Sequence, residues 1–366
     1  MKQLVDFLSE DDVRNINEYF DTAKRRHPAW SALNVDNQKF TYDRAPKDYL
    51  TKEAIHLICS KIEGETWLKE VLKRVTQVAN FEEAVSALAE IRCYGAMLSA
   101  GFWVGPLPTG STPTPDFEFK LDGVTGVIEV AAKLEHDDQV KMAKQIAVGD
   151  TPKGVERLTK HTKRLRIDIV VSEGHPFGAP NVDKAGDTTQ TNAISRICSI
   201  KAKETQLEPG KPSLLWIDFR DMGRWPAVLS PEQAFPLISG RDGILCSGAI
   251  WYAFFGSVGL PVFDSDWGGR QIITPMAHFG RFHPQAPKIS GYSAAIFCLD
   301  KATILFENPA AAAPLTDSLR AALTRLPRFE LAHSIVNWQS GHIDQAITVA
   351  RTMIDVLHNN RTTEEW

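Results

Sequence analysis

The sequence predicts an α/β protein in which a mixed central sheet is flanked by helices, with helical regions at the N- and C-terminal ends. Short apolar segments typical of buried strands lie between residues 102 and 299, and amphipathic segments at helical spacing lie on either side of them. The 366 residues, 43% of them hydrophobic, are enough for two domains or for one domain with sizeable appendages. We divide the chain into a helical region at 1–80, a core at 81–308 with an insertion at about 134–191, and a C-terminal helical region at 309–366.

Helices are expected first. Ser9 followed by Glu-Asp-Asp is typical of a helix N-cap with acidic residues in the first turn. An amphipathic run extends from Lys52 to Val78, where apolar residues recur near helical spacing. Another helix is expected from Phe81 to Ala100, because the following Gly101 is a common helix-ending residue.

The segments after this helix alternate between predicted strands and helices. A tight turn at Asp122-Gly123 joins two of the strands into a hairpin. We expect strands at Phe102–Val104, Phe117–Leu121, Val124–Ala131, Ile167–Val171, Leu214–Phe219, Ile244–Phe255 and Ser293–Leu299. Further helices are expected at Asn192–Leu207, Leu315–Leu326 and Ile343–Leu357.

The cellular compartment is predicted from three features. Residues Gly243 to Phe263 carry no charge and are long enough to span a bilayer, but several glycines and Pro261 favour two buried strands around a turn. The N-terminus lacks the basic head and apolar core of a signal peptide. Five scattered cysteines, none in a Cys-x-x-Cys pair, indicate reduced thiols. We therefore expect a cytoplasmic protein with no membrane partner.

Three carboxylates and one amine form the candidate site. Glu129 lies inside the apolar run Val-Ile-Glu-Val-Ala-Ala, where a buried charge needs a metal or a cation as partner. Asp116 begins the partner strand of the hairpin, and the tight turn would bring it level with Glu129. Glu90 lies beside the apolar stripe of the preceding helix, and Lys133 shares a strand face with Glu129. Such oxygen ligands suit a divalent cation, and the amine suits a phosphate.

The predicted elements of the core follow in the order helix, strand, two hairpin strands, helix and strand. With the residues of the candidate site, this order resembles the PD-(D/E)XK nuclease superfamily, which has the restriction-endonuclease-like fold. The resemblance covers about Phe81 to Phe219, interrupted by the insertion. The residues that carry it are Glu90, Gly101-Phe102, Pro115-Asp116-Phe117 and Ile128-Glu129-Val130.

The resemblance implies a deoxyribonuclease that hydrolyses phosphodiester bonds in DNA with Mg²⁺ or Mn²⁺, in restriction, repair or phage defence. It implies that Asp116 and Glu129 bind the metal and that Glu90 binds a second ion or a metal-bound water. Lys133 would stabilise the transition state or the attacking water. DNA is the expected ligand, and a second copy of the chain or a separate defence or repair protein stays open as a further partner.

One position departs from the family pattern. The family lysine lies two residues after the glutamate, and that place is Ala131 here. Lys133 lies about 7 Å further along an extended strand, unless a bulge draws it back. Lys201 or Lys203 could supply the amine instead, from the following helix. The alternative function is therefore a catalytically inactive nuclease-like module that binds nucleic acid or a protein partner.

Other charged groups carry weaker signals. The net charge of −4 argues against a general nucleic-acid coating protein, although a nuclease can have a local basic surface. Basic residues near helical spacing in the insertion suit either phosphate contacts or a solvated helix face: Arg157, Lys160, Lys163, Arg164 and Arg166. Asp264-Ser-Asp266 resembles the Asp-x-Asp metal motif of sugar-nucleotide transferases, but the Trp267-Gly-Gly that follows favours a polar turn.

Overall fold

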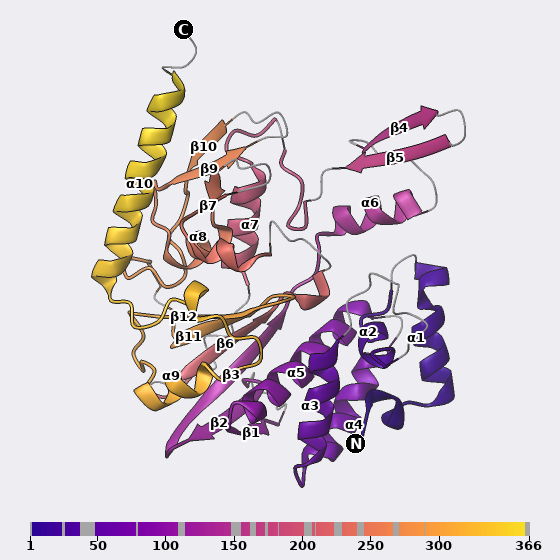
Figure 1. The fold of residues 1–366 in the computed structure, drawn as a ribbon. Coiled ribbons are helices and arrows are strands. Elements are labelled where there is room, and N and C mark those ends of the chain that lie inside the picture. The colour runs from indigo at the N-terminus through magenta and orange to yellow at the C-terminus, as the bar shows by residue number, and fades with distance from the viewer. Residues whose placement is uncertain are drawn as a thin grey trace.

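A six-stranded mixed sheet forms the centre of the protein in a computed structural model (Figure 1). The structure describes residues 2–23, 26–36, 48–77, 80–108, 114–147, 155–161, 166–172, 175–181, 183–200, 207–208, 210–222, 229–239, 245–265, 271–288 and 290–362. The strands in sheet order are β1 (Trp103–Pro106), β2 (Phe117–Leu121), β3 (Val124–Ala132), β6 (Ser213–Asp218), β11 (Ala294–Cys298) and β12 (Thr303–Glu307). The predicted α/β class with a mixed sheet between helices is confirmed.

The sheet combines an antiparallel half with a parallel centre. β1, β2 and β3 pair antiparallel, β3, β6 and β11 pair parallel, and β12 returns antiparallel to β11. The predicted turn at Asp122-Gly123 joins β2 to β3 with φ angles of 49° and 79°, the left-handed values that a two-residue hairpin turn requires.

Helices cover both faces of the sheet. Side chains of β6 alternate between the two sides, as the period of a strand requires. Leu214 and Trp216 pack with α5 (Phe81–Ser99), whereas Leu215 and Ile217 pack with α7 (Thr189–Cys198) and α8 (Ala249–Phe255). In Figure 1, α7 and α8 lie on one side of the sheet and α5 lies on the other.

The N-terminal helices extend the layer that contains α5. These elements are η1 (Leu4–Phe7), α1 (Glu10–Ala23), α2 (Trp30–Leu33), α3 (Tyr49–Cys59) and α4 (Gly64–Val75), and their apolar side chains join the α5 side of the core. The amphipathic run expected from Lys52 to Val78 forms two helices, α3 and α4. A Cβ at Gly64 would lie 2.0 Å from the carbonyl oxygen of Ile58, so only glycine allows α4 to start this close to the end of α3.

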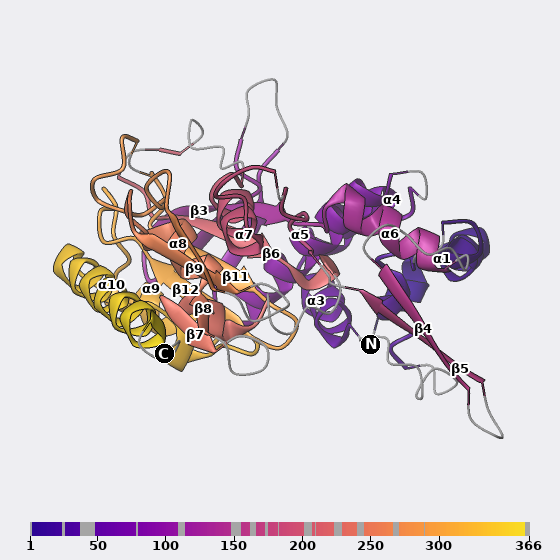
Figure 2. The same ribbon diagram turned by 90° about the horizontal axis from the view of Figure 1, so that it is seen from above.

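The segment predicted to be an insertion contains α6 (Asp137–Ala147), β4 (Val155–His161) and β5 (Arg166–Ser172). β4 and β5 pair antiparallel into a hairpin that projects from the body of the protein (Figures 1 and 2). The strand predicted at Ile167–Val171 is confirmed, but the helix suggested by the basic residues is wrong. Arg157 and Lys160 lie in β4 and Arg166 in β5, because β4 pairs with the β-branched run of β5. Lys163 and Arg164 lie outside the described residues.

The C-terminal half departs from prediction at several segments. The helix expected at Asn192–Leu207 is α7, which ends at Cys198, and β12 was not predicted. Where a strand was expected at Ile244–Phe255, the chain forms the short strand β8 (Leu245–Ser247) and then α8. Every residue of α8 is buried, and a helix that is apolar on all sides has no amphipathic pattern to reveal it. The remaining elements are η4 (Arg220–Met222), η5 (Pro231–Ala234), β7 (Leu237–Ser239), β9 (Pro261–Ser265), β10 (Gln271–Pro275), α9 (Asp317–Leu323), η7 (Leu331–His333) and α10 (Ser340–Thr362). Within the described ranges, none of the helices has the length and apolar character needed to cross a bilayer.

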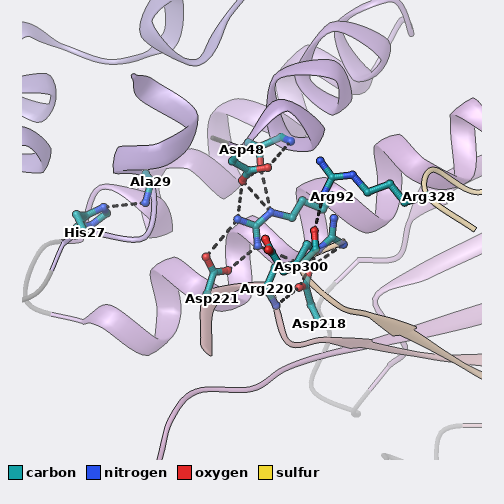
Figure 3. A network of polar contacts seen from close by, with 10 residues as sticks. His27, Ala29, Asp48, Arg92, Asp218, Arg220, Asp221, Asp300 and Arg328 are labelled. Atoms are coloured by element: carbon teal, nitrogen blue, oxygen red, sulfur yellow. Dashed lines mark hydrogen bonds and ion pairs between the residues drawn. The ribbon is translucent and has the colours of Figure 1, made fainter. Parts of the chain in front are cut away.

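A buried cluster of charges joins the helical layer to the sheet (Figure 3). Arg92 of α5, 3% exposed, donates to Asp48 at the start of α3 at 2.6 Å and to Asp221 of η4 at 2.5 Å. Arg220 lies 3.0 Å from Asp218 at the end of β6. Burial raises the pKa of Asp221, whereas for Asp48 the opposing effect of Arg92 and of bonds from Thr51 lowers the pKa despite burial. The cluster therefore depends on the arginine for its charge balance.

We expect Arg92→Met to lower the free energy of unfolding by about 3–5 kcal/mol, because it leaves the carboxylates of Asp48 and Asp221 buried without their main cation. Urea denaturation of wild type and variant measures the loss. Arg351→Met on the exposed side of α10 is the matched control and should change stability by less than about 0.5 kcal/mol. A loss in the Arg92 variant no larger than in the control would contradict the prediction.

Candidate functional site

A cleft of about 1150 Å³ opens where the antiparallel half of the sheet stops. The ladder between β2 and β3 ends at the pair Phe117 and Ile128, while β3 continues to Ala132 beside β6. Among the described residues, no strand covers this outer edge of β3 beyond Ile128. The cleft follows that edge between α4 and α5 on one side and the end of α7 on the other.

All four predicted site residues line this cleft. Glu90 comes from α5, Asp116 from the residue before β2, Glu129 from β3 and Lys133 from the residue after β3. The residues are separated by up to 43 positions in the sequence, and the fold brings them together because the hairpin turn sets the register of β2 against β3.

Asp116 is held against β3 by two hydrogen bonds. Its backbone N–H donates to the carbonyl of Ile128 at 3.0 Å, and its Oδ2 accepts from the N–H of Val130 at 2.7 Å. The carboxylate thus takes the place of a strand partner for Val130, which lies beyond the paired part of β2. Asp116 therefore lies beside Glu129 across the two strands, as the hairpin predicts.

Glu129 is the most buried acid of the cleft, at 3% exposure. It pairs in register with Leu215 of β6, within the apolar centre of the sheet. An ionised carboxylate at such a depth costs free energy unless cations or hydrogen-bond donors compensate it. This burial makes Glu129 the strongest candidate in the cleft for a ligand of a cation.

Glu90 is bound by an arginine that the sequence did not reveal. Both carboxylate oxygens accept from Nη1 of Arg74 on α4, at 2.8 and 2.9 Å, and Nε of the same arginine contacts Glu83 at 2.9 Å. Burial raises the pKa of Glu90, the negative charge of Asp116 raises it further, and Arg74 opposes both. Arg74 thus competes with any cation for the carboxylate of Glu90.

The donor set fits a magnesium-type ion held by two carboxylates. Within the described part of the chain, no three His, Cys, Asp or Glu side chains are grouped as a metal site. Mg²⁺ is commonly bound through one or two carboxylates, with waters and substrate phosphates completing its shell. Asp116 and Glu129, adjacent on the open edge of β3, meet that requirement without Glu90.

Two basic residues besides Arg74 line the cleft. Lys133 donates its backbone N–H to the carbonyl of Asp218 at 2.9 Å, which fixes its position after β3. Arg196 reaches the cleft from the last turn of α7. Ala131, where the resemblance would require a lysine, packs against the apolar cluster of α7 and α8. Lys201 and Lys203 lie outside the described residues.

The alternative acidic motif belongs elsewhere in the fold. Asp264 is buried in β9 and accepts from the N–H of Gln190 at the start of α7 at 3.0 Å. Asp266 lies outside the described residues. Asp264 does not line the cleft, and its hydrogen bond gives it a role in positioning α7.

We expect Asp116→Ala to lower the free energy of unfolding by about 1–3 kcal/mol, because the N–H of Val130 loses its acceptor. Asp116→Asn retains a side-chain oxygen for that bond and should cost less. Urea denaturation of the two variants separates the structural bond from the charge. Equal losses in Asn and Ala variants would contradict the structural role.

Glu90 should give the stability a specific pH dependence. Because its pKa in the folded protein is raised above the ordinary 4.5, its protonation favours the native state. This contribution is fully present below the unfolded-state pKa and is lost as the pH rises through the folded-state pKa. Glu90→Gln should therefore be least stable relative to wild type at low pH, as measured by urea denaturation between pH 4 and 7. A loss of stability in Glu90→Gln, relative to wild type, that is the same at every pH or that becomes larger as the pH rises would contradict this.

Comparison of the chain with protein-family models, with curated proteins and with solved structures finds no match.

Proposed function

We propose that the protein is a divalent-metal-dependent nuclease that hydrolyses phosphodiester bonds in DNA. The observation that carries the proposal is the meeting of Asp116 and Glu129 at the open edge of β3, in one cleft with Glu90 and Lys133. In this proposal Asp116 and Glu129 hold Mg²⁺ or Mn²⁺.

The order of elements supports a restriction-endonuclease-like core. In sequence order α5, β1, β2, β3, α7 and β6 give a helix, three antiparallel strands, a second helix and a strand parallel to β3. The two helices cover opposite faces of the sheet. We propose that α6, β4 and β5 form an insertion between β3 and α7.

The charges of the cleft support a role for a metal ion in binding DNA. Its lining contains the carboxylates of Glu70, Glu90, Asp116 and Glu129, against the cations of Arg74, Lys133 and Arg196. Four acids and three bases leave a formal charge of −1, which repels a phosphodiester. One bound divalent ion reverses the sign to +1 and makes the cleft attractive to a phosphate.

Each residue of the cleft has its own role in the proposed reaction. A bound divalent ion polarises a phosphate and lowers the pKa of an attacking water. Asp116, fixed by Val130, and the buried Glu129 provide a rigid pair of oxygen ligands. Lys133 provides positive charge where negative charge develops on the phosphate. Glu90 does not contact the metal in this proposal, and instead it holds Arg74 at the wall of the cleft.

An inactive nuclease-like module is the second candidate function, and Ala131 is the observation that favours it. Its side chain provides no amine at the family position, and it packs into the apolar cluster. Such a module would bind nucleic acid through the same cleft or surface without cleaving it.

We expect wild-type protein with Mn²⁺ to cleave DNA and Glu129→Gln to reduce kcat by about 10²-fold or more, because a charged ligand of the ion is lost. Cleavage is measured on linear, circular and single-stranded DNA. Glu118→Gln on neighbouring β2 is the matched control, since Glu118 lies outside the cleft beside Lys120. Absence of cleavage in wild type, with equal DNA binding by wild type and Glu129→Gln, would favour the inactive module.

A further inference from the structure

Arg196 lies on the rim of the cleft with its neighbours on α7 anchored in the core. Ala193, Ile194 and Ile197 are buried in the apolar cluster below the helix. Arg196 is exposed and points away from that face, so its guanidinium is held on a rigid element without being buried by it. α7 is in turn fixed by Asp264, which accepts the N–H of Gln190.

A second cavity of about 550 Å³ adjoins the cleft, and Arg196 stands at the boundary. Both cavities are lined by Ser86 of α5, by Ala132 and Lys133 at the end of β3, and by Arg196 of α7. These four residues form a neck between the cavities. The neck therefore contains two cations, Lys133 after the end of β3 and Arg196 on α7.

Arg196 differs from Arg74 in having no acidic partner among the described residues. Arg74 is bound by Glu83 and Glu90. Arg196 forms no ion pair with any residue that the structure describes, and only its backbone carbonyl takes part in a side-chain bond, from Ser199 at 3.1 Å. A guanidinium that lines a cleft without a carboxylate partner is suited to a bidentate bond with a phosphate.

The charges beyond the neck indicate on which side the phosphate lies. Apart from the neck residues, the titratable lining of the smaller cavity consists of His136 and four acids: Glu82, Glu83, Glu135 and Asp137. Glu83 pairs with Arg74, and the acids of this cavity still outnumber its lysine and arginine, so a further phosphate is disfavoured beyond the neck. A phosphate at the neck is thus kept on the side of Asp116 and Glu129.

We propose that Arg196 and Lys133 form a two-sided clamp for one backbone phosphate of the nucleic acid, next to the carboxylates of the cleft. The inference rests on the proposed function and deepens it, since it identifies the residues that position the phosphodiester. Arg196 contacts the phosphate and does not bind the metal ion.

The test combines cleavage with DNA binding for Arg196→Met, Arg196→Lys and the control Arg351→Met. Arg196→Met should lower kcat/KM with Mn²⁺ by about 10²-fold, and lysine should restore part of it. The slope of log binding constant against log salt should fall by about one unit in Arg196→Met. Binding of Mn²⁺, measured by calorimetry without DNA, should equal that of wild type. Arg351→Met should match wild type throughout.

The outcomes separate the two proposals. Cleavage and a salt slope for Arg196→Met equal to those of wild type would overturn the clamp while leaving the nuclease intact. A wild-type protein that binds DNA without cleaving it would overturn the nuclease, and a lower slope in Arg196→Met would then still support the clamp. Loss of Mn²⁺ binding in Arg196→Met would overturn the clamp, because it would show that the substitution acts by disturbing the carboxylates of the cleft and not by removing a phosphate contact.

Discussion

The buried charge cluster around Arg92 is the constraint on which the arrangement of the site depends. Arg92 extends from α5, the helix that carries Glu90, and reaches the start of α3 and the region after β6. Asp218 belongs to the same cluster, and its backbone carbonyl accepts from the N–H of Lys133. One cluster therefore fixes α5 and the end of β3 relative to each other. Three aspartates against two arginines leave no spare cation, so the loss of Arg92 cannot be compensated within it.

The cleft itself arises from a difference in strand length. Because β2 begins only at Phe117, opposite Ile128, while β3 continues to Ala132, the sheet has an uncovered edge in its interior, next to its parallel centre. Backbone groups on such an edge need partners. Asp116 meets part of this need through Val130, and in doing so it brings a carboxylate next to Glu129. Local hydrogen bonding and a potential metal site thus share one residue.

The electrostatic balance of the cleft explains why its cations have unequal roles. Arg74 neutralises Glu83 and Glu90, and it limits the repulsion between Glu90 and Asp116 that raises the pKa of Glu90. Arg196 neutralises no acid among the described residues. In our proposals the first arginine maintains the wall of the site and the second binds the substrate, and the buried Glu129 with Asp116 holds the ion.

The sequence by itself determined the elements whose signals are local. The helix at Phe81–Ser99, the strands β2 and β3 and the turn at Asp122-Gly123 follow from apolar period and turn chemistry, and this register alone brings Asp116 beside Glu129. Only the tertiary structure decided that α3 and α4 are separate helices and that residues 249–255 are helical, because close packing and complete burial override the local pattern. It also decided the pairing of Glu90 with Arg74 and the presence of Arg196 in the cleft. Such contacts join distant segments through packing, and no spacing in the sequence encodes them.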